Sequence, residues 1–309
     1  MSKYLTIAES QKILGLSKSK VYELKNDPHV KEILGRDIIW EKNPERYLED
    51  DIIILKEKLK RHNTKIICFT AFKGGVGKTT SSGEVGAILA QKGYQTLLID
   101  LDYTQCNLTS DFGEEDEFEG KTLYDVFRMA KTIDEVIHNS RIDNLYYIPG
   151  SIRLSEYQAG QLKRTILKEK LEKTNFDFII IDLPPSINDA TFWGLNAATE
   201  AYIPVIPDKY SLKGIESNIM TINITKEQTN PKLQLKGLFV TMAQKGTTVA
   251  ELIKEVVSDK SLPWLNVIIP RRQEVVNARN NGHFVAEINP NSDLIKEYNK
   301  LVEVILNGR

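Results

Sequence analysis

The sequence predicts an α/β fold, a mostly parallel, twisted β-sheet flanked by helices, with a small second domain at the N-terminus. Three observations support this prediction. The chain has 309 residues, enough for one large domain and one small domain. After residue 64, apolar strand-like runs alternate with helical stretches. Runs as continuous as "FIIID" (178–182) are typical of strands buried on both faces of a parallel sheet.

The character of the sequence changes near residue 63. The preceding residues show short helical patterns and end in an amphipathic stretch, "LEDDIIILKEKLKRHN" (48–63), whose basic tail suits a linker. We therefore expect a small domain with a linker helix over residues 1–62 and the α/β domain over residues 63–309. The expected strands of the second domain are 65–72, 96–102, 145–150, 176–185, 201–207, 235–242 and 264–270, and two expected helices are 154–173 and 247–258.

The composition and charge of the chain limit the kinds of function that the protein can have. The formal net charge of −1, with 41% hydrophobic and 27% charged residues, is typical of a globular protein that is not coated in basic residues. Any nucleic-acid contact would then come from a local patch or from an oligomer. No apolar run has the length of a membrane helix, and "MSKYLTIAES" has no signal-peptide pattern. Cys68 and Cys106 lack metal-ligand spacing, so we expect free thiols and a cytoplasmic protein.

The stretch "FTAFKGGVGKTTSSGEVG" (69–86) has the order strand, glycines, helix that a phosphate-binding loop requires. Glycines let backbone N–H groups approach phosphates, and the helix N-terminus adds partial positive charge. In this arrangement Lys78 reaches the β- and γ-phosphates, and the Thr79 hydroxyl ligates Mg²⁺. Phe72 stands six residues before Lys78, where an ordinary loop has glycine, and a second lysine, Lys73, follows it.

Carboxylates follow two of the expected strands. Asp100 and Asp102 end the run in "LLIDLDYTQCNLT" (97–109), and Asp182 ends "FDFIIID" (176–182). In a parallel sheet the carboxyl ends of the strands are where ligands bind. The sequence therefore places three carboxylates near the phosphate loop.

"KGGVGKTT" (73–80) resembles the deviant Walker A motif of the ParA/MinD family of P-loop ATPases, and the resemblance covers about residues 64–309. It implies a slow, partner- and DNA-stimulated ATPase that uses ATP and Mg²⁺ and works as a homodimer. In that family the extra lysine, here Lys73, reaches the other subunit's nucleotide. The loop residues expected to contact the nucleotide are Lys73, Gly74, Gly75, Val76, Gly77, Lys78, Thr79 and Thr80.

The resemblance also assigns roles outside the loop. Asp102 would orient or deprotonate the attacking water, Asp100 would support the Mg²⁺ environment, and Asp182 would hold Mg²⁺ through water. Segments 203–217 and 238–245 resemble those that border the adenine, which indicates Pro207, Asp208 and Met242. The family usually continues D-x-D-P-Q-x-N, whereas "DLDYTQCN" (100–107) has Tyr103 in place of proline and one extra residue, so the resemblance does not set the hydrolysis rate.

The first domain has a helix-turn-helix pattern, "LTIAESQKILGLSKSKVYEL" (5–24). Residues 8–14 form its first helix, Gly15 permits the turn, and Leu16 and Val21 would join a small core. With 46–59, the segment resembles winged helix-turn-helix domains of the MerR or excisionase type, whose second helix enters the major groove. An alternative is a helical dimerisation domain. The side chains expected to face DNA are Ser17, Lys18, Lys20, Tyr22 and Lys25.

The stretch "IPRRQEVVNARNNG" (269–282) carries Arg271, Arg272 and Arg279 on an expected surface loop and helix. In ParA-family dimers arginines of this region contact DNA without sequence preference, so the resemblance implies phosphate contacts here. The alternative is a solvated charged surface. Contacts of that kind position a protein on DNA and weaken with salt.

Together these observations favour an ATP-dependent DNA-partition ATPase. By resemblance, ATP closes the dimer on DNA, and a centromere-binding, ParB-like partner stimulates hydrolysis and release. The N-terminal domain would add site-specific binding and repression of the protein's own operon. Two alternatives stay open, a nucleotide-sensing repressor with incidental hydrolysis and a MinD-like membrane-cycling ATPase. A metabolic ligase or an iron–sulfur ATPase is disfavoured by the N-terminal domain and the cysteine pattern. The C-terminal segment 292–309 has core-like apolar spacing, which favours packing on the domain over a membrane tether.

Overall fold

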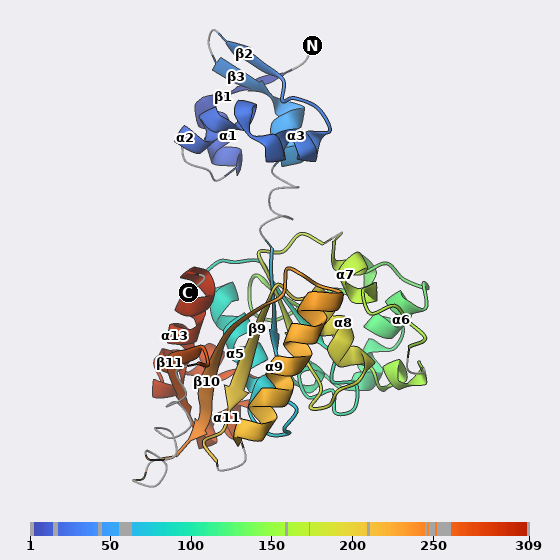
Figure 1. Cartoon of the computed structure of the whole chain (residues 1–309), viewed down its shortest axis with the longest axis vertical. Helices are drawn as coiled ribbons and strands as arrows, with labels where there is room; N and C mark the ends of the chain where they lie inside the picture. The colour runs from blue at the N-terminus through green and yellow to red at the C-terminus, as the bar shows by residue number, and fades with distance from the viewer. Residues whose placement is uncertain are drawn as a thin grey trace. The chain divides into compact units, whose positions relative to one another are not determined.

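The structure is a computed structural model of the chain, and the chain divides into two compact units, Met1–Thr64 and Lys65–Arg309 (Figure 1). Each unit has its own hydrophobic core and is described by itself. The residues that the structure describes are 3–14, 18–42, 45–55, 64–157, 160–172, 174–208, 211–244, 246, 251 and 261–307.

The first unit combines short helices with a three-stranded antiparallel sheet in the order β1-β3-β2. Residues 49–55 are helical and follow β3 directly. The elements are β1 (Tyr4–Thr6), α1 (Ile7–Leu14), α2 (Lys18–Glu23), a 3-10 turn (Leu24–Asn26), α3 (Pro28–Leu34), β2 (Trp40–Lys42) and β3 (Glu45–Leu48).

Two polar contacts fasten this small unit. The fully buried Tyr47 of β3 donates its hydroxyl proton to the carbonyl of Val21 in α2 at 2.9 Å. The fully buried Asp51 accepts two hydrogen bonds from Arg36, at 2.9 and 2.5 Å, and one from the N–H of Ile39 at 2.8 Å. A bidentate arginine–carboxylate pair fixes both position and orientation, so it holds the helical segment 49–55 against the chain before β2. The expectation that Val21 belongs to the core is confirmed.

The second unit is built on an eight-stranded sheet in the order β11-β10-β9-β4-β8-β5-β7-β6. All neighbouring strands are parallel except β6 and β7, which confirms the predicted mostly parallel sheet. All seven expected strands occur, and among the described residues of this unit only the two-residue edge strand β6 was not expected. The strands are β4 (Lys65–Phe69), β5 (Thr96–Asp100), β6 (His138–Asn139), β7 (Leu145–Ile148), β8 (Phe178–Asp182), β9 (Glu200–Val205), β10 (Gln234–Ala243) and β11 (Trp264–Pro270).

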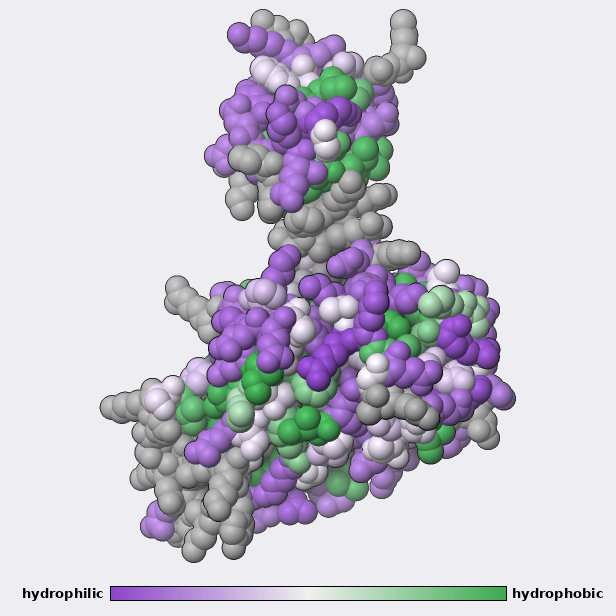
Figure 2. Space-filling view, turned by 45° about the vertical axis from the view of Figure 1, so that its right-hand side comes forward, coloured by the Kyte–Doolittle hydropathy of each residue, from purple (hydrophilic) through white to green (hydrophobic). Residues whose placement is uncertain are grey.

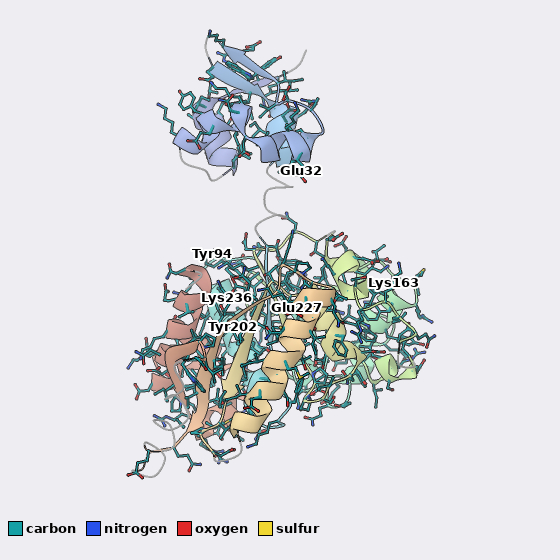
Figure 3. All side chains as sticks on the ribbon, viewed as in Figure 1. Glu32, Tyr94, Lys163, Tyr202, Glu227 and Lys236 are labelled. Carbon is teal, nitrogen blue, oxygen red and sulfur yellow. The ribbon has the colours of Figure 1, made fainter. Side chains whose placement is uncertain are left out.

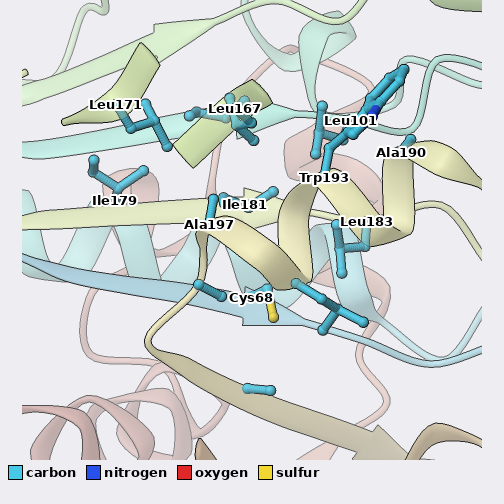
Figure 4. Packing of buried hydrophobic residues seen from close by; sticks show 14 of the residues in the cluster. Cys68, Leu101, Leu167, Leu171, Ile179, Ile181, Leu183, Ala190, Trp193 and Ala197 are labelled. Atoms are coloured by element: carbon cyan, nitrogen blue, oxygen red, sulfur yellow. The ribbon is translucent and has the colours of Figure 1, made fainter. Parts of the chain in front are cut away.

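Helices cover both faces of the sheet. In Figure 1, α9 (Ser211–Gln228) crosses in front of the strands and α5 (Lys78–Gln91) lies behind them. Figure 4 shows the core on one face, where Trp193 and Ala197 of α8 (Asp189–Ala197) pack over Ile181. The remaining α-helices that the structure describes in this unit are α6 (Leu123–Phe127), α7 (Ile166–Leu171), α11 (Gln273–Arg279), α12 (Val285–Ile288) and α13 (Asp293–Asn307).

The C-terminal helix α13 packs on the second unit as expected. Its apolar side chains, among them Leu294, Tyr298 and Leu301, are buried in the core that α5 shares. Among the described residues no helix is both long and apolar enough to cross a membrane. Figure 2 shows a surface with mainly hydrophilic residues and smaller hydrophobic patches on the face drawn there.

The expectation of one helix over 154–173 was wrong. Residues Ile152–Glu156 form a 3-10 turn, and the next helix in this range is the short α7. Between them Gly160 has φ +76°, a left-handed conformation that ends helical geometry. Of the expected helix 247–258, all residues except Glu251 lie outside the described residues.

Candidate nucleotide site

The phosphate loop lies between the central strand β4 and helix α5. Gly75 and Gly77 have φ values of +71° and +87°, which glycine adopts without steric cost and which turn the loop into the helix. Helix α5 begins at Lys78 with Gly77 as its N-cap residue. Thr241 at the end of β10 donates its hydroxyl proton to the carbonyl of Val76 at 2.8 Å, so the loop is also fastened from across the sheet.

Lys78 and Asp182 are both buried at the end of the sheet. Only 6% of Lys78 is exposed, and burial lowers the pKa of its amine, while the charges of Asp182 and Asp102 oppose this. Burial raises the pKa of Asp182, and the nearby hydroxyls of Thr79 and Ser82 and the charge of Lys78 act the other way. Ser82, one turn into α5, donates to Asp182 Oδ1 at 3.1 Å. Such a group of buried charges is poised for a charged ligand.

Asp100 and Asp182 occupy paired positions on the neighbouring strands β5 and β8. Asp100 accepts hydrogen bonds from the N–H of Asp102 at 3.0 Å and from the N–H and hydroxyl of Thr109, at 2.9 and 2.8 Å. Both Asp100 oxygens therefore accept hydrogen bonds from the loop after β5. Asp102 accepts from the Thr104 hydroxyl at 2.6 Å and lines the phosphate cavity.

Lys73, the second lysine of the loop, forms an ion pair with Asp208 of its own chain. About half of the Lys73 side chain is exposed, at 48%, so the pair lies at the surface. The structure thus brings together two residues that were expected at the site for different reasons. Lys73 stands at the rim of the loop and not in its interior.

Two cavities meet at the phosphate loop. The smaller, of about 180 Å³, is lined by the whole run from Gly74 to Thr80 together with Asp102 and Arg279. The larger, of about 460 Å³, brings the expected Pro207 and Met242 together with Gly75 and Gly77. A volume of this size is typical of small-molecule pockets. The remaining residues that line the larger cavity are Thr80, Ile206, Thr241, Gln244, Ile269, Pro270, Arg271, Arg272, Val275, Val276, Leu294 and Tyr298.

The three arginines expected on a DNA-binding surface have other surroundings here. Arg271 and Arg272 precede α11 and line the larger cavity, although Arg271 is also exposed. Arg279, at the end of α11, forms a bidentate pair with the buried Asp111 and donates to the carbonyl of Asn107 at 2.8 Å. Its guanidinium is thus held by the second unit and remains partly exposed, at 23%.

The site fits a magnesium-bound nucleotide on the observations of this structure. Asp182 Oδ2 is buried and has no hydrogen-bond partner among the described residues. Thr79 lines the cavity next to the loop glycines, and a hydroxyl together with a carboxylate is an oxygen donor set that suits Mg²⁺. The described residues contain no group of three or more potential ligand side chains of the types His, Cys, Asp and Glu.

In the first unit the expected DNA-facing residues are only partly described. Lys18 is exposed, and Tyr22 has 36% of its surface exposed. Lys25 is bound to the strands that follow, because its amine pairs with Glu45 at 2.5 Å and lies 4.5 Å from the ring centre of Trp40. Ser17, Gly15, Leu16 and the side chain of Lys20 lie outside the described residues.

The sequence pattern missed three polar residues at the site. Ser82, Asn107 and Asp111 each bond to a residue named above. Ser82 could have been found, because it lies four residues after Lys78 on the same face of α5. The position of Asp111 depends on a partner 168 residues further along the chain, which no local pattern reveals.

The fold and the loop define the class of protein, a P-loop nucleoside triphosphatase. A family model described as "AAA domain" matches residues 64–235. The chromosome-partitioning ATPase Soj of Treponema pallidum is 34% identical over 249 residues, 78% of this chain and 97% of that protein. The chain belongs to the ParA/Soj-type family of P-loop ATPases.

Solved structures agree at the level of the fold. A putative plasmid partition protein of Borrelia burgdorferi bound to AMPPNP has a TM-score of 0.66 and 28% identity, over 80% of this chain and 100% of its own. Cobyrinic acid a,c-diamide synthase of Mycobacterium smegmatis with bound ADP and magnesium has a TM-score of 0.67 and 26% identity, over 80% and 97%. The fold is thus shared with a biosynthetic enzyme, while the partition ATPases are the nearer match in identity.

Proposed function

We propose that this chain is an ATP-dependent DNA-partition ATPase. The observation that carries the proposal is the cluster of buried charges, Lys78, Asp182 and Asp102, around a glycine loop in a member of the partition family. ATP and Mg²⁺ are the cofactors that such a cluster fits. Bound Mg²⁺ would neutralise charge on the phosphates, held by the Thr79 hydroxyl and, through water, by Asp182.

The residues of this chain would divide the chemistry of hydrolysis among them. Lys78 neutralises charge on the terminal phosphates, and its burial strengthens that interaction because water is excluded. Asp102 faces the same cavity and orients the attacking water in line with the leaving group. Asp100 holds the loop that carries Asp102, through its bonds to Thr109 and the Asp102 N–H. Asp100 is therefore a positioning residue in this proposal.

Lys73 would couple nucleotide to dimerisation. In a homodimer whose nucleotides face each other, a lysine from each subunit shields the phosphates of the other. The exposed position of Lys73 and its surface pair with Asp208 support this role, because a surface ion pair exchanges at little cost. The closed dimer would bind DNA without sequence preference, through Arg271 and Arg272, and a ParB-like partner would stimulate hydrolysis and release on the nucleoid.

The first unit would act as a winged helix-turn-helix domain that binds a specific DNA site and represses the protein's own operon. Its support is the arrangement of α1 and α2 followed by the β2–β3 hairpin, with Lys18 and Tyr22 exposed on α2. Lys25 would strengthen the hairpin instead of contacting DNA directly. A dimer would read two half-sites.

Two substitutions test the ATPase site in the full-length chain. Lys78→Ala should abolish nucleotide binding, whereas Asp102→Ala should retain ATP and lose turnover by about a hundredfold or more, as for a general base or water-positioning group. For each variant, the Kd of ATP is measured by titration calorimetry, and the turnover rate is measured as phosphate release. Lys92→Ala is the matched control, an exposed lysine at the far end of α5 that pairs with Glu303. Near-normal turnover in Lys78→Ala would refute the assignment.

DNA binding is tested by fluorescence anisotropy on two duplexes, one random and one from upstream of the protein's own gene. Binding to random DNA that requires ATP and weakens with salt would support partition. A preference for the upstream duplex that is lost with Lys18→Ala would support the first unit as its reader. Nucleotide-independent binding to the upstream duplex alone would instead make the protein chiefly a repressor.

A further inference from the structure

Arg279 has surroundings that its expected role in DNA binding does not explain. Its Nε donates to Asp111 Oδ1 at 3.0 Å and its Nη2 to Asp111 Oδ2 at 2.8 Å. Asp111 is only 3% exposed, and burial raises its pKa while the charge of Arg279 opposes that shift. A bidentate bond to a buried carboxylate leaves a guanidinium little freedom to turn.

The third bond of Arg279 goes to the loop that carries Asp102. Nη2 donates to the carbonyl of Asn107 at 2.8 Å, and Asn107 lines the smaller cavity together with Asp102. Arg279 also lines that cavity, together with the phosphate loop from Gly74 to Thr80. The guanidinium is therefore fixed at a wall of the cavity by three hydrogen bonds from its Nε and Nη2 atoms.

The Nη1 atom of the Arg279 guanidinium is the part that is left to bind a ligand. Among the residues that the structure describes, none accepts a hydrogen bond from Nη1 of Arg279. The side chain is 23% exposed, and the cavity that it lines is the one formed by the phosphate loop. An arginine whose Nε and Nη2 are already bonded has little rotational freedom left to lose. Its Nη1 can therefore donate to phosphate oxygens at a low entropic cost.

We propose that Arg279 is a phosphate-binding residue of the nucleotide site, oriented by Asp111, and that its ligand is the phosphate chain of the nucleotide. The proposal rests on the proposed function, because it assumes that a nucleotide occupies the loop. It adds a cation from α11 to the two lysines of the loop. Because Arg279 also bonds to Asn107, a bound phosphate chain fastens α11 to the loop that carries Asp102.

The test compares Arg279→Gln with Arg141→Gln in the full-length chain. Arg141 is a matched control, because it also makes a multidentate pair, with Glu287, and also bonds to Asp111, through the carbonyl at 3.1 Å, yet it does not line the described cavity of the phosphate loop. The Kd values of ATP, ADP and adenosine are measured by calorimetric or competition titration, with thermal midpoints for both variants.

Arg279→Gln should weaken ATP and ADP binding by about ten- to hundredfold, the range of a charge-assisted hydrogen bond, and leave adenosine unchanged. Arg141→Gln should leave all three Kd values unchanged. Arg279→Lys keeps the charge but cannot form the two-pronged bond, so it should show an intermediate loss, and it serves as the readout if the glutamine variant does not fold.

Three results would overturn the inference. An equal loss for adenosine would mean that Arg279 only maintains the fold. Unchanged binding of ADP and ATP by Arg279→Gln would show that Arg279 does not contact the phosphates. If DNA binding were lost at the same time, Arg279 would instead be a DNA-binding residue. Lys78→Ala in the same titration separates the two proposals, because normal ATP binding in that variant would contradict the nucleotide site itself.

Discussion

Asp51 in the first unit and Asp182 in the second are both fully buried carboxylates, but their partners differ. Asp51 accepts two bonds from Arg36 and one from the Ile39 N–H. Asp182 accepts from Ser82 through Oδ1, and its Oδ2 has no partner among the described residues. A buried carboxylate oxygen without a partner costs free energy, so we expect Asp51 to stabilise the fold and Asp182 to bind a ligand.

Glu84 is a third buried carboxylate, and its partners are backbone N–H groups. Its two carboxylate oxygens accept the N–H groups of Val285 and Ala286, both at 2.8 Å, in the first turn of α12. Burial nevertheless raises its pKa from 4.5 to about 7. The two backbone hydrogen bonds thus do not compensate for the whole cost of burying the charge. Three substitutions separate these cases.

The largest expected effect is at Asp182. Asp182→Asn should lower the rate of ATP hydrolysis by about a thousandfold, equivalent to about 4 kcal/mol of transition-state free energy, because Mg²⁺ loses a carboxylate. The thermal midpoint of the nucleotide-free protein should not fall, because the substitution removes a charge that burial disfavours. Asp177→Asn, just before the same strand at its opposite end, is the control and should hydrolyse ATP normally. Normal ATP hydrolysis by the Asp182→Asn variant would contradict the expectation that Asp182 binds a ligand rather than stabilising the fold.

Asp51 should show the reverse pattern. Asp51→Ala should destabilise the first unit by about 2–4 kcal/mol, because Arg36 and the Ile39 N–H lose their shared acceptor. Amide hydrogen exchange of residues 18–55 reports this loss in the full-length chain, and ATP hydrolysis should not change. The control is Asp37→Ala, which removes an exposed pair with Lys31 and should cost under about 1 kcal/mol. If the amide protons of residues 18–55 exchanged equally slowly in Asp51→Ala and in Asp37→Ala, Asp51 would not stabilise the first unit.

Glu84 should produce the smallest effect, and one that depends on pH. The folded chain holds the Glu84 proton up to about pH 7, whereas the unfolded chain releases it near 4.5. The Glu84 contribution to the free energy of unfolding is therefore fully present below pH 4.5 and is lost as pH rises through about 7. The total change should be at most on the order of 3 kcal/mol.

Urea unfolding across this range, compared between the natural chain and Glu84→Gln, measures the contribution. The difference in unfolding free energy between the two should vary with pH only in that window. Glu227→Gln is the control, since this glutamate is exposed on α9 (Figure 3). A pH-independent difference for Glu84→Gln would mean that Glu84 does not titrate as its burial indicates.

The sequence predicted those parts of the molecule that depend on nearby residues. The seven longer strands and the loop around Lys78 follow from continuous apolar runs and glycine spacing. The broken helix at 154–173 was missed because its apolar spacing is helical and the left-handed conformation of Gly160 decides the outcome. The surroundings of Arg279 could not be read from a local pattern either, since its carboxylate partner is 168 residues away.

The position of β4 in the sheet has a mechanical consequence. This strand begins at Lys65, directly after the first unit, and pairs in parallel with β8 on one side and β9 on the other. To detach β4, two ladders of hydrogen bonds would have to break, whereas the edge strand β11 is held by one ladder. The strand that leads into the phosphate loop is thus held on both sides.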